Sequence, residues 1–162
     1  MKLKLLIVVW RRLLFFLGFS EYLIVAAQGK SGGVCLFWSS NIFVEVLEFN
    51  SVTIAISIHD SVCSWSLVGF YGPSYYHKKI KAWTNLVALL QSLESPWLCF
   101  GDFNLIVEAN ENLGGHTGST SATNYLRNLM FELGAVDLGF SGAKFTWCNK
   151  RWGKGCIKER LD

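Results

Sequence analysis

Residues 97–104, Trp-Leu-Cys-Phe-Gly-Asp-Phe-Asn, constrain the fold of this chain more than any other run. The first four residues are apolar, which predicts a short strand covered on both faces. Gly101 removes the side chain where the backbone turns, and Asp102 and Asn104 lie on the same side if the extended geometry continues. A carboxylate and an amide at the tip of a core strand favour a functional site, although Asp, Asn and Gly are also ordinary turn residues.

The chain before this run is rich in apolar, alternating segments that predict strands. They cover residues 21–27, 34–38, 42–49, 52–58 and 65–71. Asn50-Ser51 predicts a hairpin turn between two of them. The alternation within 52–58 predicts one buried face and a second, less buried face.

A helix is expected over residues 74–94, with an apolar stripe toward the core and with Lys78, Lys79 and Lys81 facing outward. This helix connects the strand that ends at Tyr71 to the strand that leads to Asp102. A helical crossover of this length predicts two parallel neighbouring strands, so we expect the tips at Tyr71 and Asp102 to lie side by side.

The pattern after Asn104 is less regular. Residues 108–121 are polar and rich in glycine, which predicts a loop in which Glu111 is a solvated charge. Further elements are expected as a helix over 123–133 and strands over 136–138 and 144–149.

Residues 144–160 form a basic segment, opposed only by Glu159. Its cations are Lys144, Lys150, Arg151, Lys154, Lys158 and Arg160. Trp147 and Trp152 are interleaved with them. Basic groups neutralise phosphates and aromatic rings stack on bases, so the segment favours nucleic-acid binding; a solvated hairpin is the alternative.

Composition predicts a single domain over residues 1–162 in a reducing, intracellular environment. The chain is 51% hydrophobic, which excludes disorder. Its five cysteines include no Cys-x-x-Cys pair, and Cys35, Cys63 and Cys99 are predicted to be small buried apolar residues. The three histidines are too scattered for metal-ligand spacing.

The N-terminal residues alternate between apolar runs and the charged break at Trp10-Arg11-Arg12. This break disfavours both a membrane helix and the uninterrupted core of a signal peptide. Helical spacing from Leu6 to Leu17 instead predicts a helix packed on a sheet, ending at Gly18. We therefore expect no stable membrane association, with attachment through residues 1–27 as the alternative.

Five motifs occur in order along the chain. They are Gly69-Phe70-Tyr71-Gly72-Pro73, Gly101-Asp102-Phe103-Asn104, Asp137-Leu138-Gly139-Phe140-Ser141-Gly142, Phe145-Thr146-Trp147 and Glu159-Arg160-Leu161-Asp162. Together they resemble the endonuclease/exonuclease/phosphatase (deoxyribonuclease-I-like) superfamily. More narrowly, they resemble the apurinic-type endonuclease domain of plant LINE-type non-LTR retrotransposons. The resemblance implies an α/β (α+β) four-layer sandwich of two mixed β-sheets flanked by helices.

The resemblance also implies Mg²⁺-dependent hydrolysis of DNA phosphodiesters in the nucleus. It implies that Tyr71 hydrogen-bonds near the scissile phosphate, that Asp102 orients or deprotonates the attacking water, and that Asn104 helps to bind the phosphate. Asp162 resembles the aspartate that orients a catalytic histidine. The implied substrate-binding residues are Thr146, Trp147 and Arg160.

Three parts of the family pattern have no counterpart in this sequence. They are a Trp-Asn-type motif, a Glu-Thr-type motif with the metal-binding Glu, and a closing Ser-Asp-His motif. These departures imply an incomplete fold truncated at both ends, no assignable metal ligand, doubtful Mg²⁺ binding and little or no nuclease activity. A non-catalytic remnant that at most binds nucleic acid is the alternative. In either case, we expect Tyr71, Asp102, Asn104 and Thr146 to converge at one end of the sheets, with Asp162 close by.

Overall fold

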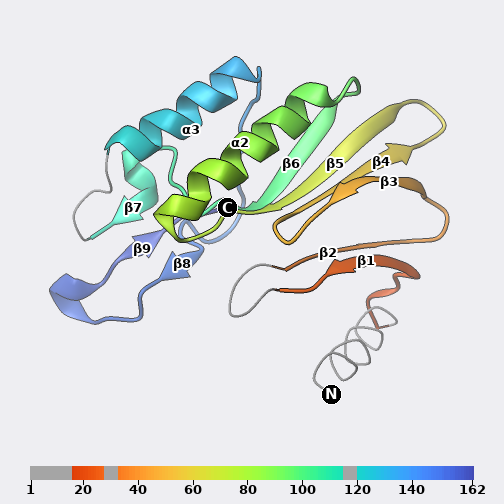
Figure 1. Ribbon diagram of the computed structural model, residues 1–162. Coiled ribbons are helices and arrows are strands. Elements are labelled where there is room, and N and C mark those ends of the chain that lie inside the picture. Colours follow the sequence, from red (N-terminus) through yellow and green to blue (C-terminus); the bar gives the residue numbers. More distant parts are fainter. Residues whose placement is uncertain (1–15, 28–32, 115–119) are drawn as a thin grey trace. The chain divides into compact units, whose positions relative to one another are not determined.

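The computed structural model describes residues 16–27, 33–114 and 120–162 (Figure 1). It divides into two compact units, one containing residues 1–70 and 93–99 and the other containing residues 71–92 and 100–162. The described residues form three sheets and two α-helices, which confirms the mixed α/β class. Most of the predicted N-terminal helix and the middle of the predicted 108–121 loop lie outside the described residues.

The strands of the first unit follow the apolar runs closely. Strand β1 (Glu21–Val25) pairs antiparallel with β2 (Val34–Trp38). The larger sheet has the order β3 (Phe43–Phe49), β4 (Thr53–His59), β5 (Ser64–Tyr71) and β6 (Trp97–Asp102). The turn at Asn50-Ser51 is confirmed, because Asn50 N–H donates to Thr53 C=O at 2.8 Å and Asn50 Oδ1 accepts from Val52 N–H at 3.0 Å.

Strand β4 is buried along most of its length. Ile54 and Ile56 pack with Leu36 of β2 in an apolar cluster, and the alternate positions Ala55 and Ser57 are buried as well. The predicted contrast between a buried and a less buried face is therefore wrong. This strand is central in its sheet, and both of its faces are covered.

Strand β6 is less buried than the sequence predicted. Leu98 and Phe100 are exposed, while Trp97 and Cys99 are half-buried, so this edge strand is not covered on both faces. Burial raises the pKa of the Cys99 thiol to about 12. Cys63 is exposed, contrary to the expectation of a buried apolar residue, because it lies in the turn between β4 and β5.

Strands β5 and β6 are parallel, as the crossover predicted. Ser66 N–H donates to Pro96 C=O at 2.8 Å, and Gly72 N–H donates to Asp102 C=O at 2.6 Å. Because both partners advance by the same number of residues between these two bonds, the strands run in the same direction.

The second unit contains α2 (Tyr76–Ser92) and α3 (Thr120–Glu132). Its small sheet has the order β7 (Asn112–Leu113), β9 (Lys158–Glu159) and β8 (Trp147–Cys148), with the 3₁₀ turns η1 (Ala109–Glu111) and η2 (Gly153–Gly155) beside it. The core of this unit includes Trp83 of α2, whose ring meets that of Tyr125 of α3 edge-on at 6.4 Å. Within the described residues, no helix has the length and apolar composition needed to cross a membrane.

Two predicted strands of this unit are corrected. Residues 136–138 are irregular, because Asp137 Oδ1 accepts the N–H of Gly139 at 2.8 Å and closes a local turn instead. The strand predicted over 144–149 shortens to Trp147–Cys148, although Thr146 N–H still donates to Glu159 C=O at 3.0 Å.

Candidate functional site

The ends of β5 and β6 meet at a tight backbone contact in the second unit. Besides the Gly72–Asp102 bond, Asn104 Nδ2 donates to Gly72 C=O at 2.5 Å. A Cβ atom at Gly72 would lie 2.1 Å from the carbonyl oxygen of Phe103, so only glycine permits this approach. Gly72, the residue after Tyr71, is therefore held against Phe103 and Asn104, which follow β6.

Residues 102–104, here called the site turn, do not continue in the extended geometry that the sequence predicted. Asp102 Oδ1 accepts the N–H of Asn104 at 3.0 Å, and Asn104 has a φ of 54°. Asparagine tolerates this left-handed conformation better than most residues, and the side chain-to-backbone bond stabilises it. The turn keeps Asp102 and Asn104 together through this direct bond rather than through strand alternation.

Thr146 and the end of the 159–162 motif are tied to the same turn. Phe103 N–H donates to Leu161 C=O at 2.7 Å, and Leu161 N–H donates to Thr146 Oγ1 at 3.1 Å. The structure thus joins Thr146, Leu161 and the site turn through consecutive hydrogen bonds. Asp162 follows directly, and its charge acts on Asp102.

Asp102 is partly buried, and its surroundings on balance raise the pKa of its carboxyl. Burial raises the pKa of the Asp102 carboxyl; the Asn104 N–H lowers it, the negative charge of Asp162 raises it further, and the Lys79 ammonium lowers it. A carboxylate whose pKa lies above its ordinary value is a stronger base than a solvated aspartate. This is the arrangement expected of a group that accepts a proton.

Lys79 is a site residue that the sequence did not predict. Its Nζ donates to Asn104 C=O at 2.8 Å, so the expectation that Lys79 faces outward is wrong. Burial lowers the pKa of Lys79, while Glu159 and Asp102 raise it. Three lysines lie close together at the start of this helix, and the helical pattern gives no sign that this one turns inward.

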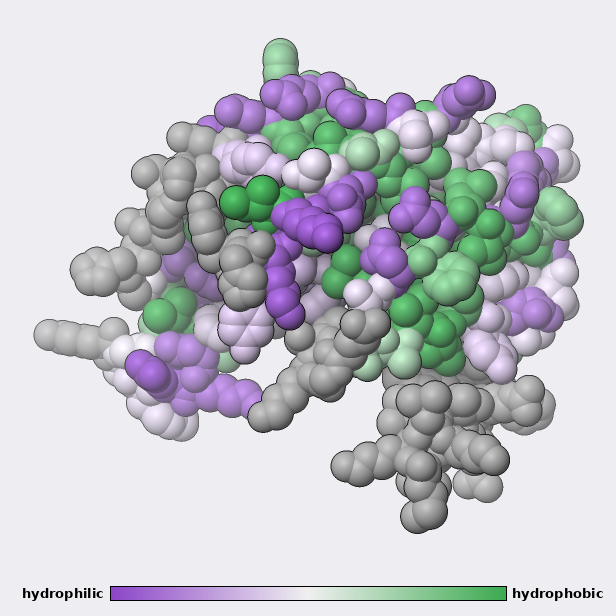
Figure 2. Space-filling view, in the orientation of Figure 1, coloured by the Kyte–Doolittle hydropathy of each residue, from purple (hydrophilic) through white to green (hydrophobic). Residues whose placement is uncertain are grey.

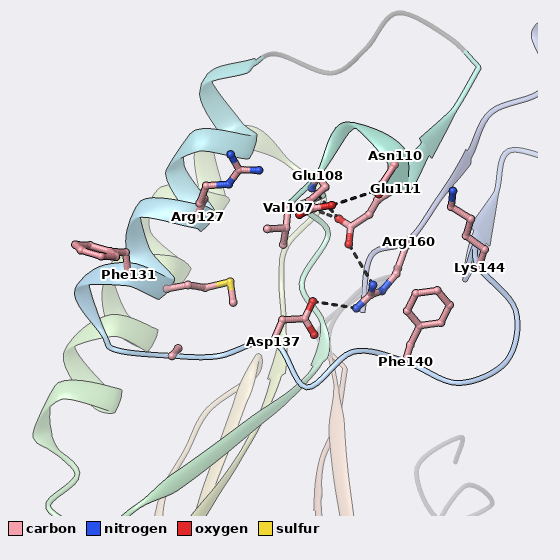
Figure 3. Close-up of a pocket in the computed structure, with 12 residues that line it drawn as sticks. Val107, Glu108, Asn110, Glu111, Arg127, Phe131, Asp137, Phe140, Lys144 and Arg160 are labelled. Carbon is pink, nitrogen blue, oxygen red and sulfur yellow. Dashed lines mark hydrogen bonds and ion pairs between the residues drawn. The ribbon is translucent and has the colours of Figure 1, made fainter.

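A partly buried ionic cluster forms the second part of the site (Figure 3). Glu111 is 7% exposed, so its prediction as a solvated charge is wrong. Arg160 lies between Glu111 and Asp137, with guanidinium-to-carboxylate distances of 3.3 Å to each. Its guanidinium carbon also lies 4.3 Å from the ring centre of Phe140. A contribution of Arg160 to substrate binding remains a prediction.

This cluster borders a hollow of about 540 Å³ that is open to solvent. The hollow lies between η1, α3 and residues 135–144, and Arg160 is the predicted site residue that lines it. Thr146 and Trp147 line a smaller hollow of about 330 Å³. Asp102, Asn104 and Tyr71 line neither hollow, so these three residues lie outside both concavities.

The β8–β9 hairpin is exposed and hydrophilic (Figure 2). Trp152 is 95% exposed at its tip, Trp147 is partly exposed on β8, and Lys150 and Arg151 are solvent-facing. Cations beside an open aromatic ring form a surface suited to the backbone and bases of nucleic acid. An isolated solvated hairpin would have the same local exposure.

The donor set at the site turn does not match a protein-built metal site. Among the described residues, no group of three or more His, Cys, Asp or Glu side chains could hold a metal ion. The nearby charges at Asp102 are the carboxylate of Asp162 and the ammonium of Lys79, and an ammonium disfavours a dication beside it. The described residues at the site turn therefore do not fit the Mg²⁺ that the resemblance implies.

Comparisons with known proteins agree with this architecture. No protein-family model and no curated protein sequence matches the chain. Among solved structures, the chain is similar to the "Endonuclease domain of TRAS1, a telomere-specific non-LTR retrotransposon", with a TM-score of 0.64 and 14% sequence identity. The match covers 87% of this chain and 64% of the TRAS1 chain, so the chain spans under two thirds of that domain. At this identity, the likeness shows the fold.

Proposed function

We propose that this chain is a phosphodiester-binding unit of the nuclease type, related to the DNA-nicking endonucleases of plant LINE-type retrotransposons and acting on nuclear DNA. The observation that carries the proposal is the site turn. It places Asp102 and Asn104 beside Gly72 and Lys79, and its central residue Phe103 is hydrogen-bonded to Leu161, which is in turn bonded to Thr146. The fold shared with the TRAS1 endonuclease domain supports the same reading.

The residues of the site turn have complementary chemistry for this role. Asp102, with its raised pKa, would accept a proton from a water molecule or orient that water. Asn104 has a second amide hydrogen beyond the one donated to Gly72, and Lys79 supplies a positive charge. Both would stabilise negative charge on a phosphate oxygen, with the Thr146 hydroxyl and Tyr71 as further donors.

We further propose that this chain by itself binds DNA and has little or no nicking activity. Hydrolysis in this fold class is expected to need a divalent ion, and the described residues lack a donor set for one. When groups that act together in catalysis are missing, rates fall by about 10⁴-fold or more. A non-catalytic remnant that at most binds nucleic acid is the alternative, and residual Mg²⁺-dependent nicking that is lost in Asp102→Ala would exclude it.

Binding is tested by fluorescence anisotropy with a labelled DNA duplex. Affinity should fall steeply between about 50 and 200 mM salt, because bound phosphates release counterions. Replacing both Lys150 and Arg151 by serine should weaken binding about tenfold at low salt. Lys81→Ser, an exposed lysine on α2, is the matched control for loss of a cation. Absence of salt-dependent binding by the unaltered chain would contradict the proposal.

Nicking is tested with supercoiled plasmid, with Mg²⁺ and with a chelator. The expected result is no nicking above background in either condition. Nicking that requires Mg²⁺ and disappears in Asp102→Ala would overturn the claim of inactivity, while leaving the nuclease assignment intact. Flotation of the chain with liposomes, in the absence of DNA, would instead favour the membrane-associated alternative.

A further inference from the structure

We propose that Arg160 is a positioning residue that holds the end of the 159–162 motif against the site turn. This inference rests on the proposed function and adds Glu111 and Asp137 to it as the anchors of Arg160. It also gives Arg160 a different role from the substrate contact implied by the family resemblance.

Each nitrogen of the Arg160 guanidinium has a partner in its own chain. Its two terminal nitrogens face Glu111 and Asp137, and its Nε donates to Asp162 C=O at 3.2 Å. One face stacks against the ring of Phe140, and the side chain is 14% exposed. Each of its three nitrogens has a partner in this way, so at most two of its five N–H groups are left for a phosphate.

Glu111 anchors Arg160 to the loop that follows the site turn. Its Oε2 accepts the N–H groups of Val107 and Glu108 at 2.6 and 3.1 Å, while Oε1 faces Arg160. The backbone adds a further bond, from Arg160 N–H to Glu111 C=O at 3.0 Å. The Glu111 carboxylate is buried, so removing the Arg160 charge would leave it buried without its ion-pair partner.

The residues after Arg160 transmit this constraint to the site turn. Leu161 accepts the N–H of Phe103 and donates its own N–H to Thr146. Asp162 then lies close enough to Asp102 to influence its protonation. Fixing Arg160 therefore holds the backbone of Leu161 and Asp162 against the site turn.

The test is amide hydrogen exchange, measured by NMR on the full 162-residue chain. In Arg160→Met, which keeps an unbranched apolar stem, the amides of Phe103 and Leu161 should exchange on the order of 100-fold faster. Those of Leu86 and Leu90 in α2 should be unchanged. Arg151→Met is the matched control, since Arg151 is an exposed arginine of the same unit and should alter none of these amides.

A titration of Asp102 tests whether the constraint from Arg160 reaches the Asp102 carboxyl. Asp162 and Lys79 are the charged groups that act on Asp102. If Arg160 sets the distance to Asp162, the pKa of Asp102 should move down toward its ordinary value in Arg160→Met, as followed by the carboxyl carbon resonance. An unchanged Asp102 titration would overturn the proposal even if exchange became faster.

Glu111→Gln is a second, milder variant that tests the proposal if Arg160→Met fails to fold. It keeps the shape of the side chain and one acceptor oxygen but removes the charge that faces Arg160, and it should give the same local pattern with a smaller change. If both variants accelerate exchange in α2 as much as at Phe103, the cluster supports the whole unit and the positioning proposal is overturned. Neither readout uses DNA, so failure of the unaltered chain to bind DNA would reject the proposed function without deciding this inference.

Discussion

The β4–β5 ladder of the first unit and the site turn of the second are stabilised in contrasting ways. Each residue from Thr53 to His59 pairs in one unbroken register with β5, and the apolar residues between them are buried. The site turn instead depends on single hydrogen bonds from separate segments, donated or accepted by Gly72, Lys79 and Leu161. When one contact of the ladder is lost, the neighbouring strand pairs still hold the two strands together. When one hydrogen bond of the site turn is lost, no neighbouring bond repeats it.

The largest effect is expected from a cavity in the ladder. Ile54→Ala removes a fully buried side chain from the cluster with Leu36 and Ile56, and should lower the free energy of unfolding by about 2–5 kcal/mol. Urea denaturation measures this change. Val62→Ala is the control, because Val62 is exposed in a turn and its truncation should change stability by less than about 0.5 kcal/mol. Equal effects of the two substitutions would show that the ladder is not the main source of stability.

Adding a methyl group at Gly72 should test the close backbone contact at the site turn. Gly72→Ala places a Cβ where Phe103 C=O lies, so the two strand ends must separate, at a cost of about 1–3 kcal/mol. The signature is loss of exchange protection at the Gly72 amide, which is bonded to Asp102 C=O. Gly155→Ala is the matched control, since its nearest neighbours would be at ordinary contact distances of 3.8–3.9 Å. Retained protection in Gly72→Ala would mean that the close approach is dispensable.

The same contrast explains what the sequence could predict. Alternation and helical spacing placed the strands of the first unit and helix α2 to within two residues, because repeated side-chain patterns reflect burial along an element. The parallel pairing of β5 and β6 also followed from the length of the crossover. The strand predicted over 136–138 failed because one side chain, Asp137, competes for the backbone.

Several residues that the sequence predicted for the site lie together in the structure, their roles remain predictions, and the hydrogen bonds between them could not be predicted. Asp102 and Asn104 could be identified as a polar pair after an apolar strand, and a family resemblance added Thr146 and Asp162. Lys79 and Glu111 could not be identified, because a charged residue that turns inward has the same local sequence as one that faces solvent. Only tertiary contacts distinguish the two cases.

The smallest effects concern two aspartates, one in each region, whose pKa values shift in opposite directions. Burial is the main cause that raises the pKa of Asp102. The N–H groups of Cys63 and Val62, at 2.9 and 2.7 Å from its Oδ1, lower the pKa of Asp60. A raised folded-state pKa gives stability that is present at low pH and lost as pH rises through it; a lowered one gives stability that is lost as pH falls.

Asparagine substitutions of the two aspartates should therefore shift the urea midpoint in opposite directions at neutral pH and have little effect on it in acid. At pH 7, Asp102→Asn should raise the urea midpoint, because the amide keeps an oxygen for the Asn104 N–H and carries no buried charge. Asp60→Asn should lower the midpoint, because a neutral amide accepts the two N–H groups less strongly than a carboxylate. Well below the ordinary aspartate value of 3.8, both parent side chains are protonated and both differences should shrink toward zero. A midpoint that falls in Asp102→Asn at pH 7 would mean that the ionised carboxylate is stabilised at the site turn, contrary to the burial argument and to the proposed role of Asp102 as a proton acceptor.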